Sequence, residues 1–153
     1  MIEIKRILVP TDLSEYAHHA LTYAAELASA YDAALYLLHV VDLQWNNAVG
    51  SADFPGPVGD MLPRITETAE KDLDEIKEKI EGIEVNASIV TGSPHVEIVR
   101  FAREWKVDVI VLATHGRTGL SHALIGSVAE KVVQMAPCPV LSIKHPEHEF
   151  VMP

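Results

Sequence analysis

The stretch of residues 113–127 combines residue types that could hold a phosphate group. Gly116 and Gly126 have no side chains, so their peptide N–H groups could lie close to an anion. Arg117 adds a positive charge between them, and Ser127 adds a hydroxyl group. The stretch leaves an apolar run and enters a helical pattern, and the first N–H groups of a helix attract negative charge. The sequence therefore predicts an anion site here, although glycines that serve only to pack the loop are a common alternative.

The signatures of several well-known enzyme classes are absent from the sequence. The order G-x-x-x-x-G-K-[ST] does not occur, which argues against a P-loop nucleotide hydrolase. No G-x-G-x-x-G follows the first apolar run, which argues against a dinucleotide oxidoreductase. A serine hydrolase would need G-x-S-x-G, which the chain also lacks.

Histidine and cysteine residues suggest little metal or thiol chemistry. The chain has 8 histidines, but their spacing matches no familiar zinc motif, and we expect no metal site built from protein side chains. His115 stands next to the glycine loop and could orient a phosphate or its metal. Cys138 is the lone cysteine and stands between two prolines, so we expect it to be buried and unreactive.

Apolar runs and helical patterns alternate along the chain. We expect strands at residues 4–9, 34–41, 83–89, 107–113 and 140–143. Helices are expected after Ser14, over residues 65–80, after Ser93 and after Ser127. Ser127 and Glu130 have the spacing of a capping box, so Ser127 is the expected N-cap of the last helix.

This order of elements predicts the fold class. No two strands are close enough in sequence to form a hairpin, so they must pair in parallel through right-handed crossovers. The result is a doubly wound α/β fold, in which helices cover both faces of a five-stranded sheet. Residues 83–89 alternate strictly between apolar and polar types, which places their strand near a sheet edge. Ligands in such folds bind beyond the carboxyl ends of the strands, where the strand order reverses.

Length and charge limit the remaining possibilities. With 153 residues the chain is expected to be a single domain over 1–153, with an irregular connection at about 43–63 and a tail at about 145–153. A net charge of −10 argues against nucleic acid as a partner. No apolar run approaches the roughly 20 residues that span a bilayer, and no targeting segment is evident. We expect a soluble, cytoplasmic protein.

Several segments together resemble the universal stress protein family. Its nucleotide-binding branch carries G-x2-G-x9-G-[ST] between the fourth strand and the fourth helix. Gly116, the nine residues 117–125 and Gly126-Ser127 match this motif in register, and Ala113 occupies the position of its first glycine. The resemblance extends to residues 8–14, 38–42, 92–95, 107–111 and 137–141.

The resemblance implies a Rossmann-like fold related to the adenine nucleotide alpha hydrolases, and binding of ATP, ADP or AMP with Mg²⁺. Asp12 would lie near the ribose, and the backbone of Val40 near the adenine. The phosphates would be surrounded by residues of the glycine loop and the following helix. The residues expected at the nucleotide are Pro10, Thr11, Asp12, Val40, Gly92, His115, Gly116, Arg117, Gly126, Ser127 and Val128.

Alternatives to nucleotide binding remain open for individual residues and for the whole chain. The alternative role of Asp12 is to cap the first helix, that of Val40 is to fill the sheet, and that of Ser127 is to cap its own helix. For the chain, the family implies a regulatory dimer of the stress response with little or no catalytic turnover. The alternative is a nucleotide-independent dimeric interaction module, for which Ala113 is the best support; slow ATP hydrolysis ranks third. The strand at residues 140–143 would leave a sheet edge unpaired, which predicts a homodimer through that strand; the alternative is that the tail at residues 145–153 folds back over the edge. The downstream protein partner stays open.

Overall fold

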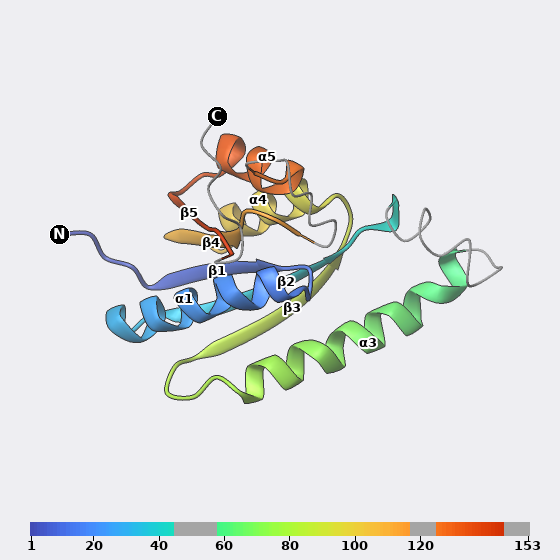
Figure 1. The fold of residues 1–153 in the computed structure, drawn as a ribbon, viewed down its shortest axis with the longest axis horizontal. Coiled ribbons are helices and arrows are strands. Elements are labelled where there is room, and N and C mark those ends of the chain that lie inside the picture. Colours follow the sequence, from blue (N-terminus) through green and yellow to red (C-terminus); the bar gives the residue numbers. More distant parts are fainter. Residues whose placement is uncertain (45–57, 117–124, 146–153) are drawn as a thin grey trace.

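The computed structural model describes residues 1–44, 58–116 and 125–145 and has a parallel sheet at its centre (Figure 1). The sheet has five strands in the order β3-β2-β1-β4-β5, and each neighbouring pair is parallel. The strands are β1 (Arg6–Thr11), β2 (Ala34–Val41), β3 (Val85–Thr91), β4 (Val109–Ala113) and β5 (Val140–Ile143). The expected doubly wound α/β fold is confirmed, and the strand that alternates in polarity, β3, lies at a sheet edge.

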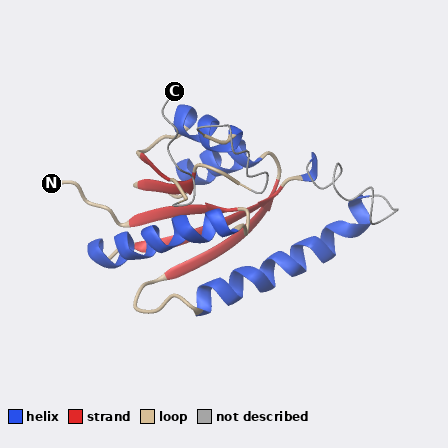
Figure 2. Cartoon of the chain, in the orientation of Figure 1, coloured by secondary structure: helices blue, strands red, loops and turns tan. Residues whose placement is uncertain are grey.

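Helices cover both faces of the sheet (Figure 2). Within the described residues they are α1 (Glu15–Tyr31), α3 (Val58–Glu78), α4 (Pro94–Glu104) and α5 (Ser127–Met135). Leu21 of α1 and Leu73 of α3 belong to one buried cluster, whereas Ile98 of α4 and Val132 of α5 belong to another. Each pair of helices therefore covers its own face. No helix among the described residues combines the length and the apolar character needed to cross a membrane.

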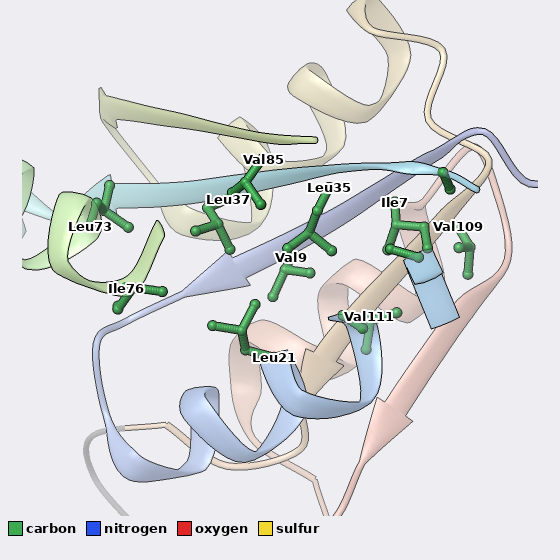
Figure 3. Close-up of a cluster of buried hydrophobic side chains, with 13 residues drawn as sticks. Ile7, Val9, Leu21, Leu35, Leu37, Leu73, Ile76, Val85, Val109 and Val111 are labelled. Carbon is green, nitrogen blue, oxygen red and sulfur yellow. The ribbon is translucent and has the colours of Figure 1, made fainter. Parts of the chain in front are cut away.

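The central strands contribute side chains to both buried clusters. Ile7, Val9 and Leu37 point toward α1 and α3, as Figure 3 shows for that cluster. Leu8 and Leu38, at the alternate positions, pack toward α4 and α5. Alternate side chains of a strand point to opposite faces, so a strand that is covered on both sides must be apolar throughout. This requirement explains the continuous apolar runs in the sequence.

Of three helix beginnings, one confirms its expected N-cap and two have N-caps that were not predicted. Ser14 is the N-cap of α1, where its Oγ accepts a hydrogen bond of 3.3 Å from the Ala17 N–H. Ser93 is the N-cap of α4, and Pro94 opens that helix. At α5 the N-cap is Gly126, so the expected capping box is wrong and Ser127 is already the first helical residue. The Gly126 N–H donates to the Thr114 carbonyl, and this tertiary bond sets where the helix begins.

The connection between β2 and α3 is shorter than the expected 43–63. Helix α3 begins at Val58 and contains Pro63, so residues 58–63 are helical. The missing N–H of Pro63 removes one hydrogen bond near the helix start, where the cost is smaller than in the middle. Gly59 and Pro63 also interrupt the apolar period, which hid this turn in the sequence. Residues 45–57 and the tail from 146 onward lie outside the described residues.

Candidate functional site

A pocket of about 330 Å³ opens at the carboxyl ends of β1, β2 and β4. Strand β1 pairs with β2 on one side and with β4 on the other, so the strand order reverses between β1 and β4. The chain leaves β1 toward α1 on one face and leaves β4 toward α5 on the other. Divergent connections of this kind open a crevice, and here the first turn of α5 forms part of its wall.

Most of the residues expected from the sequence come together around this pocket. Those that line it are Pro10, Thr11, Asp12, Val40, His115, Gly116, Gly126, Ser127 and Val128. Ala113, at the position of the missing motif glycine, also lines it. Gly92 is not part of the lining; its N–H donates to the Val41 carbonyl at the end of the neighbouring strand. Arg117 lies outside the described residues.

The pocket also has an apolar wall that the sequence did not single out. Leu38 of β2, Ile98 of α4 and Val132 of α5 line it together with Leu112 of β4. In the sequence these side chains occupy ordinary core positions, and they do belong to the core cluster on that face of the sheet. Their alternation within β2 and β4 indicates the face, but only the assembled fold shows that they border an opening. A pocket with an apolar wall and a few polar groups suits a flat, partly apolar ligand.

Asp12 lines the pocket and lies in a turn that directly follows β1. Its Oδ1 accepts a hydrogen bond of 3.0 Å from the Ser14 N–H, and Thr11 Oγ1 accepts one of 3.0 Å from the Leu13 N–H. Leu13 has a φ of 66°, a backbone conformation that a branched side chain rarely adopts. Its packing against the core offsets this strain. Since Ser14 caps α1, the alternative that Asp12 is the helix cap is not needed.

The two ends of the glycine loop are tied together by the backbone of Thr114. Its carbonyl accepts from the Gly126 N–H, and its own N–H donates to the Ile143 carbonyl over 3.0 Å. The Gly126 N–H is thus engaged within the protein, contrary to the expectation that it faces a phosphate. With a φ of −72°, Gly126 needs no special backbone freedom. Its small size is required because a Cβ atom would lie 2.9 Å from the Thr114 carbonyl oxygen.

The N-terminus of α5 supplies the donors that remain at this end of the pocket. Ser127, Val128 and Ala129 line it, and the first N–H groups of a helix have no partner within the helix. Because Ser127 is not the N-cap, its hydroxyl group is not used in a capping bond. The helix dipole adds partial positive charge at the same point. An anionic group is therefore the ligand chemistry that this end favours.

Two buried histidines border the pocket. His39 Nδ1 lies 2.9 Å from the Thr11 carbonyl oxygen, and since a carbonyl only accepts, Nδ1 carries the proton. His115 Nδ1 lies 2.9 Å from Thr114 Oγ1, whose hydroxyl group also reaches the Ile143 carbonyl at 3.4 Å. Because the Thr114 hydroxyl group donates its proton to the Ile143 carbonyl, Thr114 Oγ1 accepts a hydrogen bond from His115 Nδ1.

Cys138 is only partly buried, although burial was expected, and it does not line the pocket. Burial raises the pKa of the Cys138 thiol, and the nearby negative charge of Asp108 raises it further, while a backbone hydrogen bond with Ile110 opposes the change. The thiol thus stays protonated at neutral pH. In the part of the chain that the structure describes, no three histidine, cysteine or acidic side chains are placed to hold a metal ion.

An added methyl group should lower the free energy of unfolding by different amounts at Gly126 and at Gly116. In Gly126→Ala the Cβ meets the backbone of Thr114, so the loop must move, and we expect the free energy of unfolding to fall by about 1–3 kcal/mol. In Gly116→Ala the Cβ meets Asp12 Oδ2 at 2.7 Å, and that carboxylate can turn away. The expected cost is the hydrogen bond to the Ser14 N–H, about 1 kcal/mol.

Urea unfolding of the double variants separates these causes. In an Asp12→Ala background Gly116→Ala should cost almost nothing further, whereas Gly126→Ala should keep its full cost. An unchanged cost of Gly116→Ala in that background would show that Asp12 is not what the glycine accommodates.

Comparison with known proteins finds relatives that cover nearly the whole chain. Universal stress protein MJ0531 of Methanocaldococcus jannaschii is 35% identical over 145 residues, covering 95% of this chain and 85% of that protein. Universal stress protein MJ0577 of the same organism is 35% identical over 153 residues, covering 92% and 94%. Its solved structure matches with a TM-score of 0.84 at 34% identity, covering 95% of this chain and 99% of that one.

A third relative was solved with a ligand. This universal stress protein from Archaeoglobus fulgidus, in complex with dAMP, matches with a TM-score of 0.61 at 25% identity, covering 94% of this chain and all (100%) of that one. Residues 3–144 match the sequence pattern of the Universal stress protein family, which is nearly the whole of the described fold. The protein belongs to the universal stress protein family.

Proposed function

We propose that this protein binds an adenine nucleotide, with ATP as the main ligand, and acts as a regulatory dimer of the stress response with little or no turnover. The observation that carries the proposal is the pocket at the carboxyl ends of β1, β2 and β4, where an apolar wall meets the N-terminus of α5. A nucleotide has the same two halves, a flat base and an anionic phosphate chain. The Archaeoglobus fulgidus relative in complex with dAMP supports this class of ligand.

In the proposed complex the base lies against the apolar wall, next to the backbone of Val40. Asp12 accepts hydrogen bonds from the ribose hydroxyl groups, since an ionised carboxylate is an acceptor only. The phosphates lie at Gly116 and at the first turn of α5, where Ser127 and Val128 offer donors. Arg117, the next residue in the sequence, is expected from the family resemblance to add positive charge for the phosphates. Mg²⁺ is held mainly by phosphate oxygens and water, as is usual for this ion.

A nucleotide-independent interaction module remains the second candidate, because one observation favours it. The packing of Gly126 against the Thr114 carbonyl accounts for that glycine without any ligand. Ala113 in place of the first motif glycine points the same way. Against this candidate stands the pocket itself, whose polar and apolar parts a packing role does not require. For both candidate functions, the cytoplasm is the proposed location of the protein.

Calorimetry and thermal unfolding with MgATP test the nucleotide proposal. A ligand at about 100 times its Kd stabilises the fold by about 2.7 kcal/mol, which raises the Tm by roughly 5–10 °C for a domain of this size. Ser127→Ala should weaken binding by about 1 kcal/mol and leave the Tm without ligand unchanged, since Ser127 makes no capping bond. No heat and no shift of Tm at millimolar MgATP would leave the interaction module as the better function.

The proposed dimer forms through the edge of β5 that has no neighbouring strand among the described residues. The Ile110 and Thr114 N–H groups bond the carbonyls of Pro139 and Ile143, so these alternate residues of the strand face β4. Val140 and Ser142 then direct their peptide groups to the open edge. The edge is apolar as well, because 41% of Leu141 is exposed. A second copy could pair along this edge around a twofold axis.

Two substitutions in β5 test the dimer without damaging the core. Leu141→Lys places a charge on the edge, and Ser142→Pro removes an outward N–H while keeping the bonds to β4. Both should halve the mass measured by light scattering at tens of micromolar. Ile143 is avoided, because it packs against the core cluster. A parent protein that is already monomeric at this concentration would contradict the assembly and leave the nucleotide proposal standing.

A further inference from the structure

Strand β3 forms one edge of the sheet, and no strand among the described residues pairs with its outer side. Its 7 residues pair with β2 without interruption, from Val85 opposite Leu35 to Thr91 opposite Val41, so the strand has no bulge. It also contains no proline and no charged residue. Proteins usually protect a sheet edge by a short strand, a bulge, a proline or a charge. The edge at β3 has none of these devices, whereas β5, at the other edge, is only 4 residues long.

The hydrogen bonds to β2 show which peptide groups of β3 remain for a further strand. The Leu35 N–H donates to the Glu84 carbonyl over 2.8 Å, and the Gly92 N–H donates to the Val41 carbonyl over 3.1 Å. In a parallel pair, alternate residues of a strand direct both of their peptide groups to the same neighbour. The even-numbered residues of the segment 84–92 therefore face β2. The odd-numbered residues of β3 direct their N–H and C=O groups to the outer edge.

This outer row of peptide groups is accessible over most of the strand. Val85, at the start, is buried, but Ala87 and Thr91 are exposed and Ile89 is half-buried. The donors and acceptors of the last three residues recur at every second position along the edge. Another extended strand has the same spacing and can bond all of them together. The ligand chemistry that matches this edge is thus an extended peptide segment.

Helix α3 supplies negative charge beside this edge. Its residues Leu73 and Ile76 belong to the same buried cluster as Val85, so α3 covers one face of the sheet next to β3 (Figure 1). Residues 67–78 carry six acidic side chains and two lysines, and within the described part of the chain none of them forms an ion pair. Every acid in this segment except Asp72 is exposed. A strand added to β3 would place alternate side chains on the face that α3 covers, where basic side chains are favoured.

We propose that the outer edge of β3 is a docking site for an extended, basic segment of a partner protein, which joins the sheet as an additional strand. The backbone of that segment bonds the peptide groups of Ala87, Ile89 and Thr91, and its lysine or arginine side chains lie beside α3. No residue of β3 lines the pocket at the strand ends, and β5 lies at the other edge of the sheet. The inference therefore depends neither on the nucleotide nor on the dimer.

Amide hydrogen exchange followed by NMR tests the docking with defined peptides. The probe is an end-blocked peptide of the length of β3 in which valine and lysine alternate, and the control peptide has glutamate in place of lysine. At about ten times its Kd the lysine peptide should slow exchange of the Ala87, Ile89 and Thr91 amides about tenfold, because only the unbound protein exchanges. The amides of Asn86 and Ser88 already bond β2, so their exchange should not change. The glutamate peptide should slow none of these amides.

Two variants at Ala87 show whether the peptide pairs with the backbone. Ala87→Pro removes one outward N–H and keeps the bonds to β2, so the lysine peptide should bind about tenfold more weakly. Ala87→Thr is the matched control, since it keeps the N–H, and should bind as the parent does. Replacing the acids of residues 67–78 by their amides should also weaken binding about tenfold and remove most of its salt dependence.

Three results would overturn the proposal. One is that the lysine peptide at millimolar concentration leaves the exchange of the Ala87, Ile89 and Thr91 amides unchanged. Another is that both peptides slow these amides equally, which would refute the basic partner. The third is that the amides become protected without peptide as the protein concentration rises, which would assign the edge to a second copy of the chain.

Discussion

The pairing of β1 with strands on both of its sides is the constraint on which the rest of this structure depends. Because β2 and β4 both run parallel to β1, all three strands end at the same edge of the sheet. The chain must then leave β1 and β4 toward opposite faces, since each face is covered by its own pair of helices. The pocket, the turn at Asp12 and the start of α5 all follow from this divergence.

The proposed anion site has to work against the overall charge of the protein. The chain carries a net charge of −10, so approaching polyanions are repelled at long range. Screening over about 8 Å limits that repulsion at physiological salt, whereas hydrogen bonds and the dipole of α5 act at contact distance. The carboxylate of Asp12 also lines the pocket, and it suits hydroxyl groups better than phosphate. A small ligand with both kinds of group thus fits where a large polyanion does not.

The sequence predicted the features that depend on neighbours along the chain and missed those that depend on the assembled fold. The buried strands and the cap at Ser93 were predicted, because burial on two faces and local capping leave clear patterns. The capping box at Ser127 was wrong, because the bond between Thr114 and Gly126 moves the helix start, and no local pattern contains that bond. The apolar wall of the pocket was missed, since its residues are also core residues. Gly92 was chosen by resemblance, and the structure places it outside the lining.

The most direct test of the account is an NMR titration of the isotope-labelled protein with MgATP, read at every assigned backbone amide. The account predicts that the amides that shift lie at the carboxyl ends of β1, β2 and β4 and in the first turn of α5. At the opposite end of the sheet Tyr36 and Trp105 line a separate hollow, and the amides there should stay in place. Shifts confined to that hollow, or no shifts at saturating MgATP, would contradict the claim that the pocket at the strand ends is a nucleotide site.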